Sequence, residues 1–119
     1  MTESPAPAAP ADPFEDSGYR EAVVDLLGVI AYGELSAFER LAEDAAMAPT
    51  LEDKVAMSRM ASAEFGHLEP LQDRLTELGA DPAEAMKPFV AAIDGFHDHT
   101  APADWYEGLV KAYVGDGLA

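Results

Sequence analysis

Apolar side chains recur at intervals of three and four residues along most of this chain, a spacing that predicts helices with one buried face. The longest such segment covers residues 17–47 and contains no proline. We expect Ser17 to cap this helix and Pro49 to stop it. Its length, about 45 Å at about 1.5 Å per residue, is typical of helical bundles. The apolar stripe comprises Val23, Leu27, Ile30, Phe38 and Leu41.

A second long helix is predicted to begin after Thr50, whose side chain suits an N-cap. The acidic residues Glu52 and Asp53 in its first turn interact favourably with the helix dipole. Gly79 stands where a glycine commonly ends a helix, so the two long helices should form an antiparallel pair. The stripe of the second helix comprises Met57, Met60, Glu64, His67, Leu68, Leu71, Leu75 and Leu78.

The rest of the chain has weaker helical patterns. Residues 82–97 follow Asp81 as an N-cap, but Pro88 interrupts their pattern, which predicts a short or broken helix that crosses between hairpins. A last helix is expected to restart at residues 100–102. Its buried face would comprise Trp105, Leu109 and Tyr113. No segment alternates apolar and polar residues as a strand does, so the predicted fold class is all-α, a bundle of long antiparallel helices.

Length and composition limit what the chain can be. Its 119 residues suffice for one core, and residues 1–16, with four prolines and no apolar repeat, are predicted to be a disordered leader rich in proline and alanine. No apolar run approaches a membrane span of about 20 residues, and no signal peptide is recognisable. We therefore expect a cytoplasmic protein with no membrane partner.

Charge and cysteine content exclude several kinds of site. The chain has 23 acidic and 7 basic residues and a formal charge of -16, which disfavours binding to nucleic acids or anionic membranes. It has no cysteine, which excludes disulfides, thiolate metal sites and a cysteine nucleophile. Any metal must therefore be held by oxygen and imidazole ligands.

Three polar residues interrupt the predicted apolar stripes. Glu34 lies four residues from both Ile30 and Phe38, where an ionised carboxylate is costly unless it is paired or binds a metal. Glu64 and His67 are three residues apart and share one helix face. Two carboxylates and one imidazole on adjacent core faces predict a metal site. The alternatives are a Glu34 side chain that reaches solvent and a His67 ring bonded to a backbone carbonyl.

A short internal similarity adds a fourth candidate. Residues 31–34 (AYGE) resemble residues 113–116 (YVGD), and this places Asp116 in a position equivalent to that of Glu34. Such a duplication would be typical of repeated helical hairpins. Residues 97–99 (HDH) could bind a transition metal weakly, but we interpret them as a solvated loop.

Three stretches, VIAYGELSAFERLAEDA, MASAEFGHLEPLQDRL and FHDHTAPADWYEGLVKAYVGDGLA, resemble ferritin-like proteins of actinobacterial type that are grouped with tRNA 2-methylthio-N6-isopentenyladenosine hydroxylases. The resemblance implies that residues 17–119 are the N-terminal portion of a ferritin-like domain. It implies a di-iron core in which Glu34, Glu64 and His67 are ligands and Asp116 is the second single carboxylate. The implied reaction is oxygen-dependent hydroxylation of an unactivated C–H bond by a non-haem di-iron oxygenase.

The ligand set of one chain is incomplete. A di-iron bundle uses two single carboxylates and two Glu-x-x-His pairs, and only the pair of Glu64 and His67 is present. Either a missing C-terminal half supplies the rest, or a homodimer completes the bundle.

Three functions remain open at this stage. The chain is a hydroxylase or oxidase served by an electron donor of unknown identity, a half-ferritin that dimerises to oxidise and store iron, or an unmetallated helical interaction module. The resemblance implies a tRNA substrate for the hydroxylase, whereas the net charge disfavours one.

Overall fold

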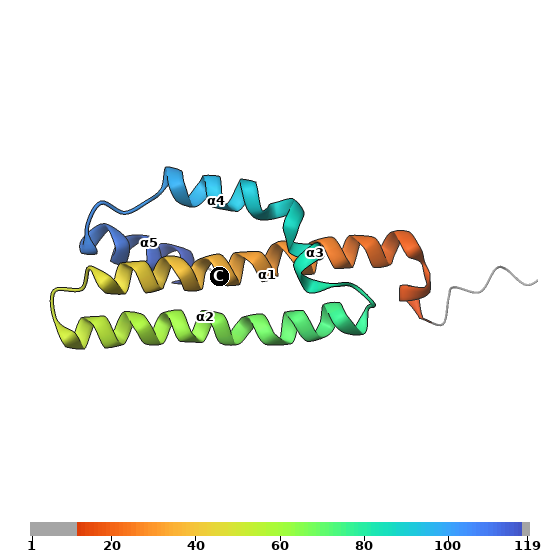
Figure 1. Ribbon diagram of the computed structural model, residues 1–119, viewed down its shortest axis with the longest axis horizontal. Coiled ribbons are helices and arrows are strands. Elements are labelled where there is room, and N and C mark those ends of the chain that lie inside the picture. Colours follow the sequence, from red (N-terminus) through yellow and green to blue (C-terminus); the bar gives the residue numbers. More distant parts are fainter. Residues whose placement is uncertain (1–11, 118–119) are drawn as a thin grey trace, which may run out of the picture.

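Helices make up most of residues 12–117, which the computed structural model describes, with side chains as far as Gly115 (Figure 1). Its elements in order are the 3₁₀ turn η1 (Pro13–Glu15), α1 (Ser17–Ala46), α2 (Leu51–Glu77), α3 (Pro82–Met86), the 3₁₀ turn η2 (Lys87–Phe89), α4 (Val90–His99) and α5 (Trp105–Gly117). No strand occurs in this part of the chain, and the prediction of an all-α fold is confirmed.

The two long helices α1 and α2 lie side by side as an antiparallel hairpin, the most extensive contact in the fold (Figure 1). Thr50 caps α2 as predicted, because its Oγ1 accepts a hydrogen bond from the backbone N–H of Asp53 at 3.1 Å. The cap of α1 is Asp16 and not Ser17. The carboxylate of Asp16 accepts the N–H of Tyr19 at 3.0 Å, and an ionised acceptor bonds an N–H more strongly than a hydroxyl does.

The chain then folds back across α1. Gly79 has a φ of 80°, which favours glycine, and it follows the end of α2 as predicted. Pro88 lies in η2, between α3 and α4, and this confirms the predicted broken helix. Helix α3 crosses α1 so closely that a Cβ atom at Gly28 would collide with the backbone carbonyl of Ala85.

Helix α5 begins at Trp105, later than the expected restart at residues 100–102. Asp104 explains this boundary, because its Oδ1 accepts a hydrogen bond from the N–H of Glu107 at 2.9 Å in the manner of an N-cap. Both α4 and α5 pack on α1, and Figure 1 shows α4 on the opposite side of α1 from α2.

The core combines alanines with residues of the predicted stripes, of which Leu41, Met57, Leu68, Leu75, Leu78 and Trp105 are buried as expected. Ile30, Met60 and Leu109 were expected on buried faces, but they are 41%, 36% and 39% exposed, and Tyr113 is also exposed. The helices are rotated so that alanines lie in their contacts, which lets the backbones approach closely. One cluster contains Leu41, Ala45, Met57, Ala61, Trp105 and Ala112, and a second contains Ala31, Leu68 and Met86.

The predicted leader, residues 1–16, lies outside the described residues as far as residue 11. Its last part forms η1, where the ring of Phe14 lies 5.3 Å from that of Tyr19 and 4.9 Å from the guanidinium carbon of Arg74. No helix among the described residues is long and apolar enough to cross a membrane.

Candidate metal centre

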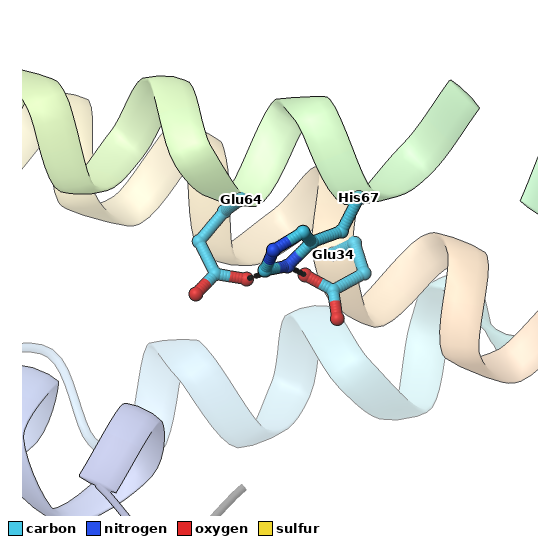
Figure 2. A group of neighbouring side chains, drawn as sticks. All are labelled: Glu34, Glu64 and His67. Carbon is cyan, nitrogen blue, oxygen red and sulfur yellow. Dashed lines mark ion pairs between the residues drawn. The ribbon is translucent and has the colours of Figure 1, made fainter. Parts of the chain in front are cut away.

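Three side chains that could bind a metal meet where α1 lies against α2 (Figure 2). Glu34 comes from α1, and Glu64 and His67 come from successive turns of α2. The Nδ1 atom of His67 lies 3.5 Å from Oε2 of Glu34 and 3.7 Å from Oε2 of Glu64. One potential ligand atom of each residue lies within 4.8 Å of the others. We call these three residues the triad.

The carboxylates of the triad are largely withdrawn from solvent. The side chain of Glu34 is 24% exposed and that of Glu64 is 15% exposed. The Oε2 atom of Glu34 is buried and has no hydrogen-bond partner, so Glu34 does not simply reach solvent. An unsatisfied buried oxygen of this kind costs about 1–3 kcal/mol, and a bound cation would remove that cost.

The donor set of the triad fits iron. Two carboxylates and one imidazole are hard and intermediate ligands of the type that non-haem iron accepts, and the chain offers no thiolate that would select a softer metal. The two carboxylates together would also neutralise the charge of one divalent cation. Glu34, Glu64 and His67 are therefore the residues that could hold iron, each through one oxygen or nitrogen atom.

His67 is more open than its predicted core position implied. Its side chain is 63% exposed, against 24% for Glu34 and 15% for Glu64. The imidazole therefore faces solvent on one side and the two carboxylates on the other. A further group could reach the triad from that open side.

The triad lines one end of a cavity of about 760 Å³. Residues from α1, α2, α4 and α5 contribute to its walls. Its lining is mostly apolar and includes Ile30, Ala37, Leu41, Phe96 and Ala112. A small organic molecule would therefore find apolar surface next to the candidate metal ligands.

Asp116, the fourth predicted ligand, belongs to α5, but its side chain lies outside the described residues. Its neighbours Val114 and Gly115 line the same cavity as Glu34. The cavity therefore extends to the part of α5 that carries Asp116, whose role as a ligand stays a prediction.

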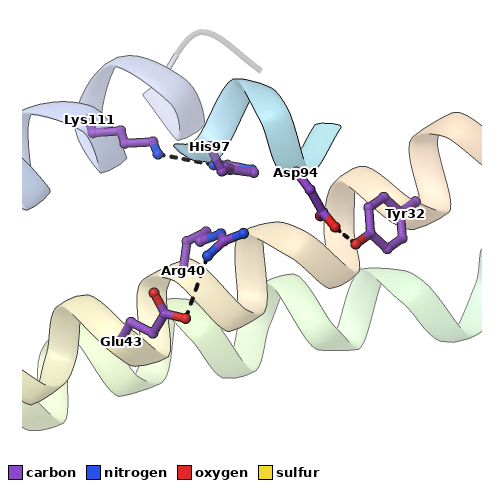
Figure 3. Close-up of polar contacts among 6 residues, drawn as sticks. All are labelled: Tyr32, Arg40, Glu43, Asp94, His97 and Lys111. Atoms are coloured by element: carbon purple, nitrogen blue, oxygen red, sulfur yellow. Dashed lines mark hydrogen bonds and ion pairs between the residues drawn. The ribbon is translucent and has the colours of Figure 1, made fainter. Parts of the chain in front are cut away.

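The cavity is also lined by polar residues that were not predicted as site residues: Arg40, His97 and Lys111 (Figure 3), and Asp44. Lys111 Nζ donates a hydrogen bond to His97 Nδ1 at 3.0 Å. Arg40 Nη1 lies 3.6 Å from Oε1 of Glu43, whereas Arg40 Nε is buried without a hydrogen-bond partner. We call Arg40, His97 and Lys111 the basic cluster.

The interpretation of His97 as part of a solvated loop was wrong, because His97 lies within α4 and is partly buried. The sequence does contain a pattern that places His97 in a helix. Ile93, Phe96 and His97 have the spacing of one helix face, so the pattern of residues 82–97 could have been continued through His97. Nothing comparable pointed to Arg40 or Lys111, which come from helices distant in the sequence.

Burial dominates the titration of this polar group. It raises the pKa of Asp44, an effect that the nearby positive charge of Lys111 partly offsets. Burial also lowers the pKa of Lys111, against the attraction of Asp44. The pKa of His97 is lowered by burial and then by the positive charges of Lys111 and Arg40, so His97 is neutral at pH 7.

One hydrogen bond fastens the α4 wall of the cavity to α1. The hydroxyl of Tyr32 donates to Oδ1 of Asp94 at 2.6 Å (Figure 3). This hydrogen bond, burial and the negative charge of Asp94 together raise the pKa of Tyr32 to about 12. The bond holds α4, with Phe96 and His97, in position over α1.

Known proteins give one point of comparison. No curated protein matches the chain detectably. The profile of a protein family described as a ferritin-like domain of actinomycetes matches residues 17–119. This range contains α1 to α5 and all three residues of the triad. The match supports the ferritin-like part of the resemblance noted from the sequence and does not extend to the tRNA hydroxylases. The chain thus belongs to the actinomycete family of ferritin-like domains.

Proposed function

We propose that this protein binds iron at Glu34, Glu64 and His67 and uses it in an oxygen-dependent oxidation, such as the hydroxylation of a small organic substrate. The observation that carries the proposal is the buried, unpartnered Oε2 of Glu34 beside a second carboxylate and an imidazole. Buried polar groups in proteins are nearly always hydrogen-bonded, and a bound cation would give this oxygen the partner that it lacks.

Each residue of the triad has a distinct part in this proposal. Glu34 and Glu64 supply two negative charges on facing helices, and His67 supplies a neutral nitrogen donor. Bound iron would supply the capacity to activate dioxygen. The apolar walls of the cavity would keep water away from the substrate and orient it toward the triad.

A di-iron centre needs a second ligand set, and the exposed side of His67 is where such a set would enter. Two sources are open: the triad of a second copy in a homodimer, or a chain segment that follows residue 119. In a two-fold dimer, two copies of the triad give two single glutamates and two Glu-x-x-His pairs. Light scattering with and without ferrous iron distinguishes these two sources of ligands. If the second ligand set comes from another copy of the chain, the protein should dimerise only when iron is present.

The size and lining of the cavity favour a small organic substrate over iron alone as the molecule that is oxidised. Storage of iron needs carboxylates along a path for the metal, whereas the described lining of this cavity beyond the triad contains one further carboxylate, Asp44, among apolar and basic residues. The net charge of -16 also opposes the approach of a polyanion such as tRNA. We therefore propose the oxidation of a small molecule in preference to the tRNA hydroxylase activity that the resemblance implies.

Anaerobic titration with ferrous iron tests the proposal. The wild-type chain should bind iron, and Glu64→Ala should bind it at least about tenfold more weakly through loss of one charged ligand. Glu69→Ala is the matched control, because Glu69 is an exposed glutamate on the same helix. On admission of oxygen, the iron-loaded wild type should consume it and Glu64→Ala should not. Equal iron binding by wild type and Glu64→Ala would contradict the proposal.

A further inference from the structure

Two buried side-chain atoms of the described residues lack a hydrogen-bond partner, and both belong to residues that line the same cavity. One is Oε2 of Glu34, an acceptor on an anion. The other is Nε of Arg40, a donor on a cation. Because each needs a partner of the opposite charge, the cavity has one end suited to a cation and another suited to an anion.

The charges around Arg40 leave its end of the cavity positive. Arg40 and Lys111 contribute two positive charges, and the buried Asp44 offsets one of them. The contact of Arg40 with Glu43 is long, at 3.6 Å, and Glu43 is 65% exposed, so solvent screens that pair. Two further acidic groups act on His97, but Asp94 accepts the hydroxyl of Tyr32 and Asp98 is exposed. Arg40 and Lys111 therefore keep one positive charge that Asp44 does not offset.

His97 adds a neutral donor to this end. The ammonium of Lys111 has only donors, so Nδ1 of His97 must be the acceptor of their 3.0 Å hydrogen bond. The neutral ring then carries its proton on Nε2. The basic cluster thus combines a guanidinium, an ammonium and an imidazole N–H, a donor set suited to a carboxylate or a phosphate.

We propose that the basic cluster binds the anionic group, a carboxylate or a phosphate monoester, of a small amphipathic substrate. The apolar part of the substrate would lie along Ala37 and Phe96 toward the triad. Glu34 and Arg40 are six residues apart on α1, which corresponds to about 9 Å along the helix axis. The reacting carbon would therefore lie several bonds from the anionic group.

This inference deepens the proposed function, since it names the class of substrate that the triad would oxidise. Binding of the anion itself, however, does not need iron. It can therefore be measured on the metal-free protein, and its failure is distinguishable from a failure of iron binding.

Isothermal titration calorimetry of the full, metal-free chain tests the proposal with octanoate, octyl phosphate and octanol as probes. Octanoate or octyl phosphate should bind saturably, and octanol at least about tenfold more weakly because it lacks the charge. The tighter of the two anions identifies the carboxylate or the phosphate as the group recognised. Equal binding of octanol, no binding of either anion, or inorganic phosphate binding as tightly as octyl phosphate would overturn the proposal.

Variants locate the binding site. Arg40→Gln and Lys111→Gln should each weaken anion binding about tenfold, while Lys54→Gln, at an exposed position on α2, should leave it unchanged. If Arg40→Gln does not fold, the Nε–H resonance of Arg40 in the wild type gives the answer. A shift of that resonance on addition of octanoate supports the proposal, and an unmoved resonance contradicts it.

Discussion

Replacement of Glu34 by glutamine should stabilise the metal-free protein and make it insensitive to iron. The wild type keeps a buried carboxylate oxygen without a hydrogen-bond partner, at a cost of about 1–3 kcal/mol. Part of that cost is already offset by His67 at 3.5 Å, so removal of the charge should return about 1 kcal/mol. For a domain of this size, about 1 kcal/mol corresponds to a rise of about 5 °C in Tm.

Iron should reverse this order of stability. Ferrous iron at a concentration of 100 times its Kd stabilises the folded wild type by about 2.7 kcal/mol, whereas Glu34→Gln gains nothing. The variant should therefore be more stable than wild type by about 1 kcal/mol without iron and less stable by about 1.7 kcal/mol with it. Both values come from anaerobic urea unfolding.

Glu39→Gln serves as the control, because Glu39 is exposed on the same helix. It should change neither the stability of the metal-free protein nor the response to iron by more than about 0.5 kcal/mol. If Glu34→Gln destabilises the metal-free chain and iron still stabilises the variant as it does wild type, the reasoning about the buried oxygen is refuted.

Two further changes test the framework of the site. Gly28→Ala should destabilise the fold by about 1–2 kcal/mol in urea unfolding, because the clash with Ala85 outweighs a gain in helix propensity of about 1 kcal/mol. Gly66→Ala should instead stabilise the fold by about 1 kcal/mol, because nothing lies near a Cβ atom at that position. Equal effects of the two substitutions would contradict the close helix crossing. Tyr32→Phe should lose about 1.5 kcal/mol with its bond to Asp94. Because the folded pKa of Tyr32 is raised from 10.0 to about 12, the contribution of this hydroxyl is fully present below pH 10 and is lost as the pH rises toward 12. A difference between wild type and Tyr32→Phe that persists above pH 12 would argue against this.

Local patterns predicted the hairpin because they depend on local physics. Thr50 as a cap, Gly79 as a stop and Pro88 as an interruption act through their own backbone groups, and each occurs in the structure where the sequence placed it. The rotation of the helices was not predicted. It depends on how closely two backbones approach, and the alanines that allow this approach carry little hydrophobic signal in a pattern analysis.

The residues of the candidate site also fall into two groups, one that local sequence patterns predicted and one that they did not. Glu34, Glu64 and His67 stood out because polar residues interrupted apolar stripes on two helices that a short loop joins, and the structure brings these residues together. Arg40, His97 and Lys111 meet only through the return of α4 and α5 onto α1. No local spacing carries that information, so the anionic end of the proposed substrate could be inferred only from the structure.

Anomalous diffraction at the iron absorption edge, from crystals grown anaerobically with ferrous iron, shows whether Glu34, Glu64 and His67 together bind iron. We expect an anomalous peak bonded to a carboxylate oxygen of Glu34, a carboxylate oxygen of Glu64 and a ring nitrogen of His67. No peak at the triad, or a peak that contacts only one of these residues, would contradict it.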